Sequence, residues 1–155
     1  YPDATFTLRL AYGVVKGIDG VGADRCDAIT TYAGLFERAR IKRDTPPFDL
    51  PPRWNGLRKE LEADAAFMGT AFNFASTADI IGGNSGSPVV NRAGELVGLI
   101  FDGNIHSLVL DVAYDDTRAR AVAVDAQGIL AALRRVYRAD ALVAEIASPA
   151  GDGAR

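Results

Sequence analysis

Residues 82–101 read GGNSGSPVVNRAGELVGLIF, and this stretch decides the fold. It begins with a loop of glycine, serine and asparagine that ends at Pro88, because these residues favour turns over regular elements. An apolar strand is expected over 87–91, turn residues follow over 92–95, and a continuous apolar run over 96–101 predicts a second, fully buried strand. The stretch therefore predicts a tight loop followed by a β-hairpin.

The small residues around Ser85 resemble the loop that carries the nucleophile of chymotrypsin-type serine peptidases. In that reaction an oxyanion develops, and preorganised backbone N–H donors must meet it. The resemblance assigns these donors to Ser85 itself and to Gly83. A tight loop needs backbone conformations that a Cβ resists, which favours glycine at 82, 83 and 86. An ordinary turn is the alternative, but it does not predict the two apolar strands that follow.

Composition and charge bound the class of protein. The chain has 155 residues, 48% of them apolar and 24% charged, as in an ordinary globular domain. A net charge of −3 gives nucleic-acid binding no electrostatic support. No stretch is long and apolar enough for a membrane span, and the single Cys26 excludes an intrachain disulfide. The start at Tyr1 shows neither an initiator methionine nor a signal peptide, which we interpret as a piece of a longer protein.

Further strands are expected on both sides of the hairpin. In the stretch TFTLRLAYGVVK, Phe6, Leu8 and Leu10 alternate with polar residues, which indicates a half-buried strand. The strands expected outside the hairpin are 5–16, 70–74, 107–114 and 120–124. Short strands at hairpin-like spacing are typical of a β-barrel.

Apolar residues that recur every three to four positions predict helices at three places. These helices are expected at about 33–43, 54–68 and 126–146. A proline-rich stretch over 46–52 separates the first from the second. We therefore predict a mainly β domain over 1–147 with added helices, and a frayed tail over 148–155.

Four longer stretches carry a more specific resemblance. They are YPDATFTLRLAYGVVKG (1–17), PPFDLPPRW (46–54), FNFASTADIIGGNSGSPVVNRAGELVGLIFDGN (72–104) and DVAYDDTRARAVAVDAQGILAAL (111–133). Together they resemble the C-terminal part of the bacterial dipeptidyl-peptidase 7 and dipeptidyl-peptidase 11 family of serine exopeptidases. The resemblance implies the second barrel of a chymotrypsin-like double β-barrel, with the first barrel and a large helical domain upstream.

The resemblance also implies that the triad His and Asp lie far upstream of Ser85, outside this chain. A serine hydroxyl is a poor nucleophile without an adjacent base. The one histidine, His106, follows Ser85 by 21 residues (106 − 85), and the family places its catalytic histidine before the serine. We interpret His106 as a loop or edge-strand residue, so the chain alone is expected to be inactive. The family implies an oligopeptide substrate, a full-length homodimer and a periplasmic or secreted location.

The motif Phe101-Asp102-Gly103-Asn104 is expected to border the substrate pocket. In the family, arginine at its third position suits acidic side chains before the scissile bond, and glycine suits aliphatic and aromatic ones. Gly103 therefore implies a hydrophobic preference, because glycine leaves room for apolar burial and offers no guanidinium to a carboxylate. Asp79 competes with this signal, since an acid six residues before the serine (85 − 79) binds Lys or Arg in trypsin-like enzymes. The family usually has a bulky residue soon after the motif, where this chain has Ile105-His106-Ser107.

No metal or cofactor is expected. Asp111, Asp115, Asp116 and Asp125 match no calcium-binding loop, and Asp115-Asp116 is interpreted as a turn. Two other functions stay open: a trypsin-like endopeptidase, which needs no free N-terminus, and a barrel module without catalysis. The intact Ser85, Gly83 and Gly86 argue against the second, because a degenerate loop is free to lose them.

Overall fold

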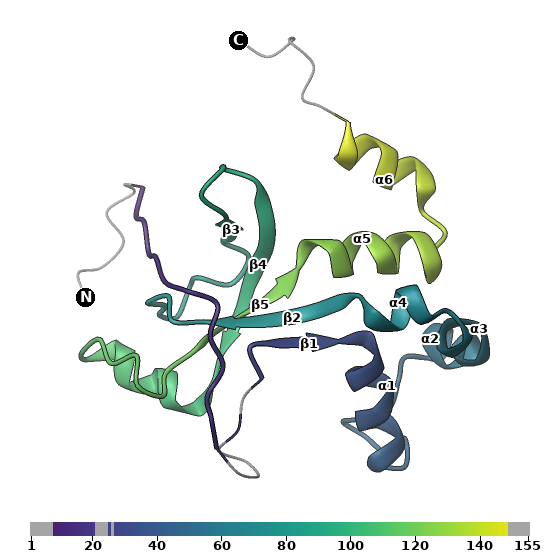
Figure 1. Cartoon of the computed structure of the whole chain (residues 1–155), viewed down its shortest axis with the longest axis horizontal. Coiled ribbons are helices and arrows are strands. Elements are labelled where there is room, and N and C mark those ends of the chain that lie inside the picture. The colour runs from purple at the N-terminus through teal and green to yellow at the C-terminus, as the bar shows by residue number, and fades with distance from the viewer. Residues whose placement is uncertain (1–7, 21–24, 26, 149–155) are drawn as a thin grey trace. The chain divides into compact units, whose positions relative to one another are not determined.

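The computed structural model describes residues 8–20, 25 and 27–148. The chain divides into two compact units, one from residues 1–30 and 71–126 and the other from residues 31–70 and 127–155. The first unit holds a β-sheet, and the second consists of helices (Figure 1). The helices predicted as additions to a barrel thus form a unit of their own. Of the tail expected over 148–155, only Ser148 is among the described residues.

The sheet has five strands in the order β1-β2-β5-β4-β3. They are β1 (Ile29–Thr31), β2 (Ala71–Ser76), β3 (Pro88–Val90), β4 (Leu96–Gly103) and β5 (Ala121–Asp125). The pairs β2–β5, β5–β4 and β4–β3 are antiparallel, which confirms the expected sheet and the expected hairpin. Among the described strands β1 and β3 lie at opposite edges, so closure into a barrel stays a prediction.

One face of this sheet is buried. Phe74, Ile100, Ala121 and Ala123 form its core. Ile100 of β4 belongs to this core and Val97 packs against it, whereas Leu96 and Phe101 remain exposed (54% and 46%). The prediction of a fully buried strand over 96–101 is therefore wrong, because an antiparallel sheet can bury one face and leave the other to solvent.

The strand predicted over 107–114 is also wrong. Its first half belongs to a 3₁₀ helix, η2 (Ile105–Asp111), and the rest is irregular. The N–H of Ser107 donates to the carbonyl of Asn104 at 2.8 Å, and the N–H of Val112 donates to the carbonyl of Val109 at 3.0 Å. Alternation of apolar residues over so few positions is compatible with a strand and with a 3₁₀ helix. The backbone hydrogen bonds between residues three apart form the 3₁₀ helix here.

The strand predicted over 5–16 is found only at its end. Residues 1–7 lie outside the described part of the chain, and 8–14 form no strand. Val15 makes an isolated antiparallel bridge with Ser76, and the N–H of Lys16 donates to the carbonyl of Ala75 at 3.0 Å. Leu8 and Leu10 are exposed, so the alternation of this segment does not lead to burial against the described residues.

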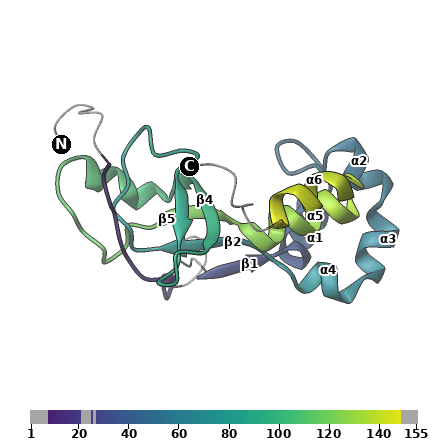
Figure 2. The ribbon, with the colours of Figure 1, turned by 90° about the horizontal axis from the view of Figure 1, so that it is seen from above.

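The second unit consists of short helices (Figure 2). Aromatic side chains pack between them. The helices are α1 (Tyr32–Ile41), α2 (Pro52–Gly56), α3 (Arg58–Ala63), α4 (Ala65–Gly69), α5 (Ala126–Arg135) and α6 (Asp140–Ala147). The rings of Tyr32 and Phe67 stack with centroids 4.4 Å apart, and Trp54 packs against both. The Tyr32 hydroxyl donates to the Gly128 carbonyl at 2.7 Å, which ties α1 to α5. None of the described helices combines the length and the apolar character that a membrane crossing requires.

The single helix predicted over 54–68 is interrupted twice. α2 ends at Gly56, and Asp64 leaves helical geometry between α3 and α4. The Asp64 carboxylate accepts from the Phe67 N–H at 3.1 Å and so caps α4. Aspartate competes with helix-interior bonding in this way, and capping replaces one long helix by two short ones.

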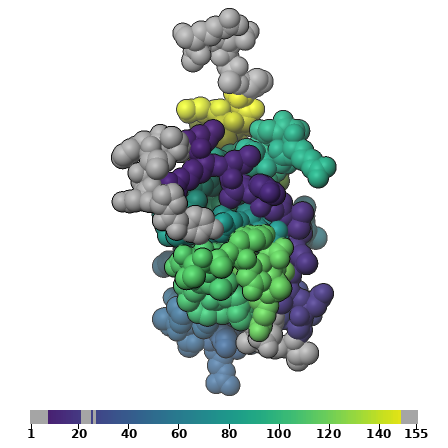
Figure 3. Space-filling view, turned by 90° about the vertical axis from the view of Figure 1, so that its left-hand side faces the viewer, coloured from purple at the N-terminus to yellow at the C-terminus, as the bar shows by residue number. Residues whose placement is uncertain are grey.

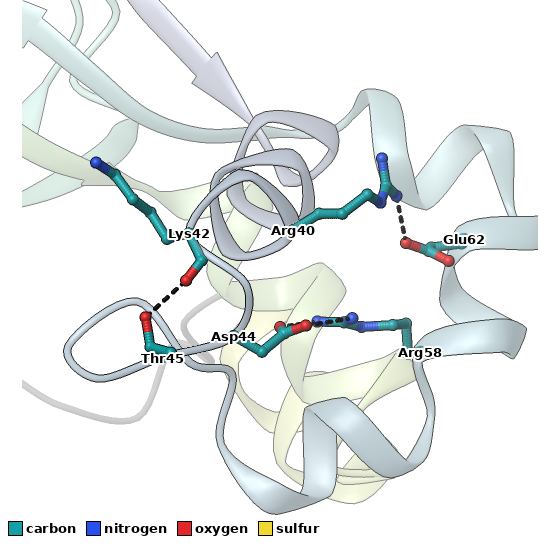
Figure 4. Close-up of polar contacts among 6 residues, drawn as sticks. All are labelled: Arg40, Lys42, Asp44, Thr45, Arg58 and Glu62. Atoms are coloured by element: carbon teal, nitrogen blue, oxygen red, sulfur yellow. Dashed lines mark hydrogen bonds and ion pairs between the residues drawn. The ribbon is translucent and has the colours of Figure 1, made fainter.

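Ion pairs hold the turn after α1 (Figure 4). The Arg58 guanidinium donates to both carboxylate oxygens of Asp44, once at 3.0 Å, and its hydrogen bonds hold the pKa of Asp44 below the ordinary value. Arg40 pairs with Glu62 at 2.8 Å, and the Thr45 hydroxyl donates to the Lys42 carbonyl at 2.6 Å. Because each pair is partly exposed to solvent, these contacts orient the turn and contribute modestly to stability.

Candidate functional site

The loop between β2 and β3 presents Ser85 to solvent, and hydrogen bonds within the loop hold it there. The N–H of Ile81 donates to the Asn84 side chain at 2.9 Å, and the N–H of Asn84 donates back to the Ile81 carbonyl at 3.2 Å. Beyond Ser85, the N–H of Gly86 donates to the Ile100 carbonyl of β4 at 2.7 Å. Asn84 therefore closes the loop before Ser85, and β4 anchors it behind.

Two of the three glycines in this loop have backbone angles that favour glycine. Gly83 has a φ of 99° and Gly86 a φ of 88°, both in the left-handed region. Gly82 is outside that region, so only part of the expectation for the glycines is met by geometry. The two left-handed residues flank Asn84 and Ser85 and turn the backbone N–H groups between them.

Some backbone N–H groups of the loop donate hydrogen bonds to carbonyls, and others do not. The N–H groups of Asn84, Gly86 and Ser87 donate to backbone carbonyls. Those of Gly83 and Ser85 donate to no residue in the described part of the chain. Two unused donors, two residues apart on an exposed loop, can bind one negatively charged oxygen.

A cavity of about 460 Å³ opens beside this loop. Loop residues 80–85, residues 100–104 at the end of β4, and Ile105, Ser107, Leu108 and Asp111 of η2 line it. In Figure 3, η2 and the segment after it (green) lie on the face toward the viewer, beside the N-terminal segment (purple). The charged lining residues are Asp102 and Asp111, and no lysine or arginine is among them. The cavity therefore offers apolar and acidic surface.

The structure brings five of the six predicted site residues to this cavity. Ser85, Gly83, Phe101, Asp102 and Gly103 all line it. The Ser85 hydroxyl makes a long hydrogen bond of 3.4 Å to the Phe101 carbonyl. The Asp102 carboxylate accepts from the Gly103 N–H at 2.8 Å, which fixes its orientation.

Asp79 lies elsewhere. It lines a second cavity of about 430 Å³, together with residues 9–12 and Tyr114. The two cavities share Ile80, Ile81 and Asn84, but Asp79 is absent from the lining of the first. Asp79 is therefore not among the residues that surround a side chain in the cavity at Ser85.

His106 belongs to η2 and does not line the cavity at Ser85. No hydrogen bond joins His106 to Ser85 in the described part of the chain.

The described residues hold no group of three or more His, Cys, Asp or Glu side chains that could bind a metal ion, and Cys26 is outside them. The Asp115 carboxylate accepts from the hydroxyl and N–H of Thr117, which lowers its pKa and fits the predicted turn.

Sequence reasoning did not find Arg120, which supports Asn104 behind the cavity wall. The Asn104 side chain accepts from the Arg120 N–H at 2.9 Å and donates to the Arg118 carbonyl at 2.7 Å. The Arg120 guanidinium is buried and donates to the carbonyls of Lys16, Gly17, Asp116 and Ala119. The available signal was an arginine at the start of the apolar run AVAV, where a charge is rarely buried without many partners.

The family model described as Peptidase S46 matches residues 1–148. Dipeptidyl-peptidase 7 of Capnocytophaga gingivalis is 39% identical over 136 residues, which are 84% of this chain and 19% of that protein. The Asp/Glu-specific dipeptidyl-peptidase of Shewanella putrefaciens is 32% identical over 171 residues, covering 94% of this chain and 23% of its own length.

Among solved structures, the chain is similar to Porphyromonas endodontalis DPP11 in complex with the dipeptide Arg-Glu. The TM-score is 0.76 at 30% identity, over 94% of this chain and 21% of that one. The chain thus spans about a fifth of the length of these relatives. Because the family model covers nearly all of its residues, the chain belongs to the peptidase S46 family.

Proposed function

We propose that this chain is the nucleophile-bearing part of a serine peptidase that releases dipeptides from the N-termini of peptides. One observation carries the proposal: an exposed Ser85 hydroxyl lies at a cavity, and the N–H groups of Gly83 and Ser85 are unused beside it. The names of the relatives, dipeptidyl-peptidases, support the release of dipeptides. The dipeptide in the similar structure supports a peptide as the ligand.

In this proposal the Ser85 oxygen attacks the carbonyl carbon of the second peptide bond. A general base takes the serine proton and passes it to the leaving amine, and the dipeptide stays on Ser85 as an ester until water releases it. The developing oxyanion accepts from Gly83 and Ser85. Among the described residues His106 makes no hydrogen bond to Ser85 and does not line the cavity, so we assign the base and its orienting carboxylate to other parts of the full-length protein.

Exposed apolar side chains support additional polypeptide around this unit. Leu8, Leu10 and Tyr12 are 101%, 84% and 85% exposed. Large apolar patches on soluble proteins usually contact another surface. We propose that an upstream barrel and helical domain provide it, and that the full-length protein is an exported homodimer. The homodimer and the exported location rest on the family resemblance alone.

We further propose a preference for apolar side chains before the scissile bond. Ile81, Phe101, Ile105 and Leu108 supply apolar walls, and the two charged lining residues are acids that repel a carboxylate. The placement of Asp79 in the second cavity weakens the case for a basic preference. The relatives include both dipeptidyl-peptidase 7 and Asp/Glu-specific enzymes, so family membership leaves the preference open.

A substrate panel tests this function. The full-length protein is assayed on fluorogenic dipeptides with free or blocked N-termini and with Leu or Phe, Lys or Arg, and Asp or Glu before the scissile bond. We expect kcat/KM to be higher for Leu and Phe than for Asp and Glu by roughly tenfold to hundredfold. Equal cleavage of blocked substrates would indicate an endopeptidase, and an acidic preference would contradict the reasoning from the cavity. No cleavage of any substrate would favour a non-catalytic module.

A matched pair of glycine substitutions separates loop geometry from general stability. Gly83 and Gly94 both have left-handed backbones, with φ of 99° and 80°, and a Cβ at either would meet no atom within 4 Å. Alanine at either position should therefore cost a similar backbone strain of about 1 kcal/mol. Only Gly83→Ala should also lower kcat, by roughly tenfold to hundredfold, because it moves an oxyanion donor. If Gly83→Ala and Gly94→Ala had equal kcat values per folded molecule, Gly83 would have no part in the reaction.

A further inference from the structure

The side chain of Ser107 closes the cavity over Gly103. A Cβ built on Gly103 would lie 2.2 Å from the Ser107 Oγ, 2.9 Å from the Ser107 Cβ and 3.2 Å from the Cδ1 of Ile80. Contacts below 3.0 Å require an atom to move, and the first two are of this kind. Gly103 is outside the left-handed region, so the lack of space and not the backbone angle excludes a side chain there.

We propose that Ser107 is a specificity-determining residue that acts together with Gly103. Both residues line the cavity at Ser85, and a substrate side chain that reaches Gly103 also meets the Ser107 hydroxyl. The Ser107 side chain thereby limits the depth of the cavity and decides whether position 103 can carry a side chain. This inference rests on the proposed function and adds a second residue to its specificity.

Backbone hydrogen bonds prevent Ser107 and Gly103 from moving apart. The N–H of Ser107 donates to the Asn104 carbonyl at 2.8 Å, which fixes the start of η2 at Ile105, two residues after Gly103. The Asn104 N–H donates to the Arg120 carbonyl at 3.0 Å, and the Asn104 side chain bonds to the segment before β5. Gly103 itself pairs with Ala121 of β5. Relief of a clash at 103 must therefore come from the side chain at 107.

The chemistry of the contact predicts how each change affects the substrate. Ile80 and Leu108 provide apolar surface near Ser107, and the Ser107 hydroxyl makes no hydrogen bond to a described residue. Removing this side chain deepens the cavity, which favours the larger of two apolar substrate side chains because more surface is buried. Adding a methyl group at Gly103 forces the wall of the cavity to shift and weakens binding.

A double-mutant cycle tests the inference in the full-length protein. The variants are Gly103→Ala, Ser107→Gly and both together, with kcat/KM measured on free-amine dipeptidyl substrates that carry Leu or Phe. Gly103→Ala should lower kcat/KM for both substrates about tenfold, mainly through KM. Ser107→Gly should shift preference toward Phe by about threefold. The double variant should recover most of the loss caused by Gly103→Ala. The inference would be overturned if the kcat/KM losses of the two single variants multiplied in the double variant. It would also be overturned if Ser107→Gly left the preference between Leu and Phe unchanged.

Gly34→Ala provides the matched control. Gly34 lies in α1, where a Cβ would meet nothing within 4 Å, so this change should be independent of Ser107→Gly. A loss in Gly103→Ala that Gly34→Ala reproduces would mean a general effect of alanine.

A readout without substrate distinguishes failure of the inference from failure of the proposed function. Amide hydrogen exchange of peptides covering β4 and η2 reports local opening in the same four proteins. Gly103→Ala should increase the opening equilibrium constant at least about threefold, and Ser107→Gly should cancel this increase. If the enzyme shows no Ser85-dependent activity but this coupling is present, the proposed function fails and the closure of the cavity by Ser107 stands. If Gly103→Ala and Ser107→Gly affected amide exchange independently, the inference that Ser107 closes the cavity over Gly103 would be overturned as well.

Discussion

Replacing Ser85 with alanine is expected to lower kcat/KM on dipeptidyl substrates by roughly four to six orders of magnitude in the full-length enzyme. In the proposed reaction, the substitution removes the oxygen that forms the acyl-enzyme bond, while the N–H groups of residues 83 and 85 remain. Transition-state binding by these donors then supplies only residual catalysis. Because Ser85 is exposed and the hydrogen bond of its hydroxyl to the Phe101 carbonyl is long, the loss of the hydroxyl should leave the fold unchanged.

Ser87→Ala is the control for this experiment. It makes the same chemical change two residues further on, at a side chain that does not line the cavity, so activity should stay within about twofold of the wild type. Labelling with a serine-reactive organophosphorus reagent gives an independent readout. Mass spectrometry should find the label on Ser85 in the wild type and in Ser87→Ala. Activity in Ser85→Ala above about 1% of the wild type would identify another nucleophile.

Replacing Arg120 with methionine is expected to lower the local stability of the sheet unit by about 2–4 kcal/mol. The buried guanidinium donates to four backbone carbonyls, which join the segment at Lys16 and Gly17 to the start of β5. Methionine fills similar volume but donates no hydrogen bond, so these acceptors lose their donor. Arg120→Lys should cost somewhat less, because an ammonium group keeps some of these bonds but lacks the fork geometry.

Hydrogen exchange in the full-length protein measures this effect. Amides of β5 and of residues 14–17 should exchange about thirtyfold or more faster in Arg120→Met. Arg92→Met is the control, since Arg92 is an exposed turn residue, and its effect should stay within about 0.5 kcal/mol. Equal protection in Arg120→Met and the wild type would show that water replaces the guanidinium at little cost.

Sequence reasoning succeeded where local chemistry decides the structure. The loop of Gly82 to Ser87 and the hairpin after it follow from turn residues and apolar runs, and both are present. It failed where short patterns fit two structures. The stretch 107–114 alternates like a strand, but the bond from Ser107 to Asn104 begins a 3₁₀ helix. The stretch 54–68 has helical spacing, but capping by Asp64 divides it.

The candidate site shows the same division. The sequence allowed us to predict Ser85, Gly83 and the 101–104 motif, because each belongs to a short motif of adjacent residues. The place of Asp79 could not, since its offset from Ser85 says nothing about which side of the loop its side chain reaches.

By itself, the sequence determined the family, the glycine-rich loop around Ser85 and the antiparallel hairpin that supports it. Turn propensity and strand periodicity act over a few residues, so they can be read from the chain alone. Only the tertiary structure decided which N–H groups stay unused, how Ser107 faces Gly103, and which carbonyls Arg120 joins. These contacts link residues up to 104 positions apart, and their geometry depends on how the whole sheet unit packs.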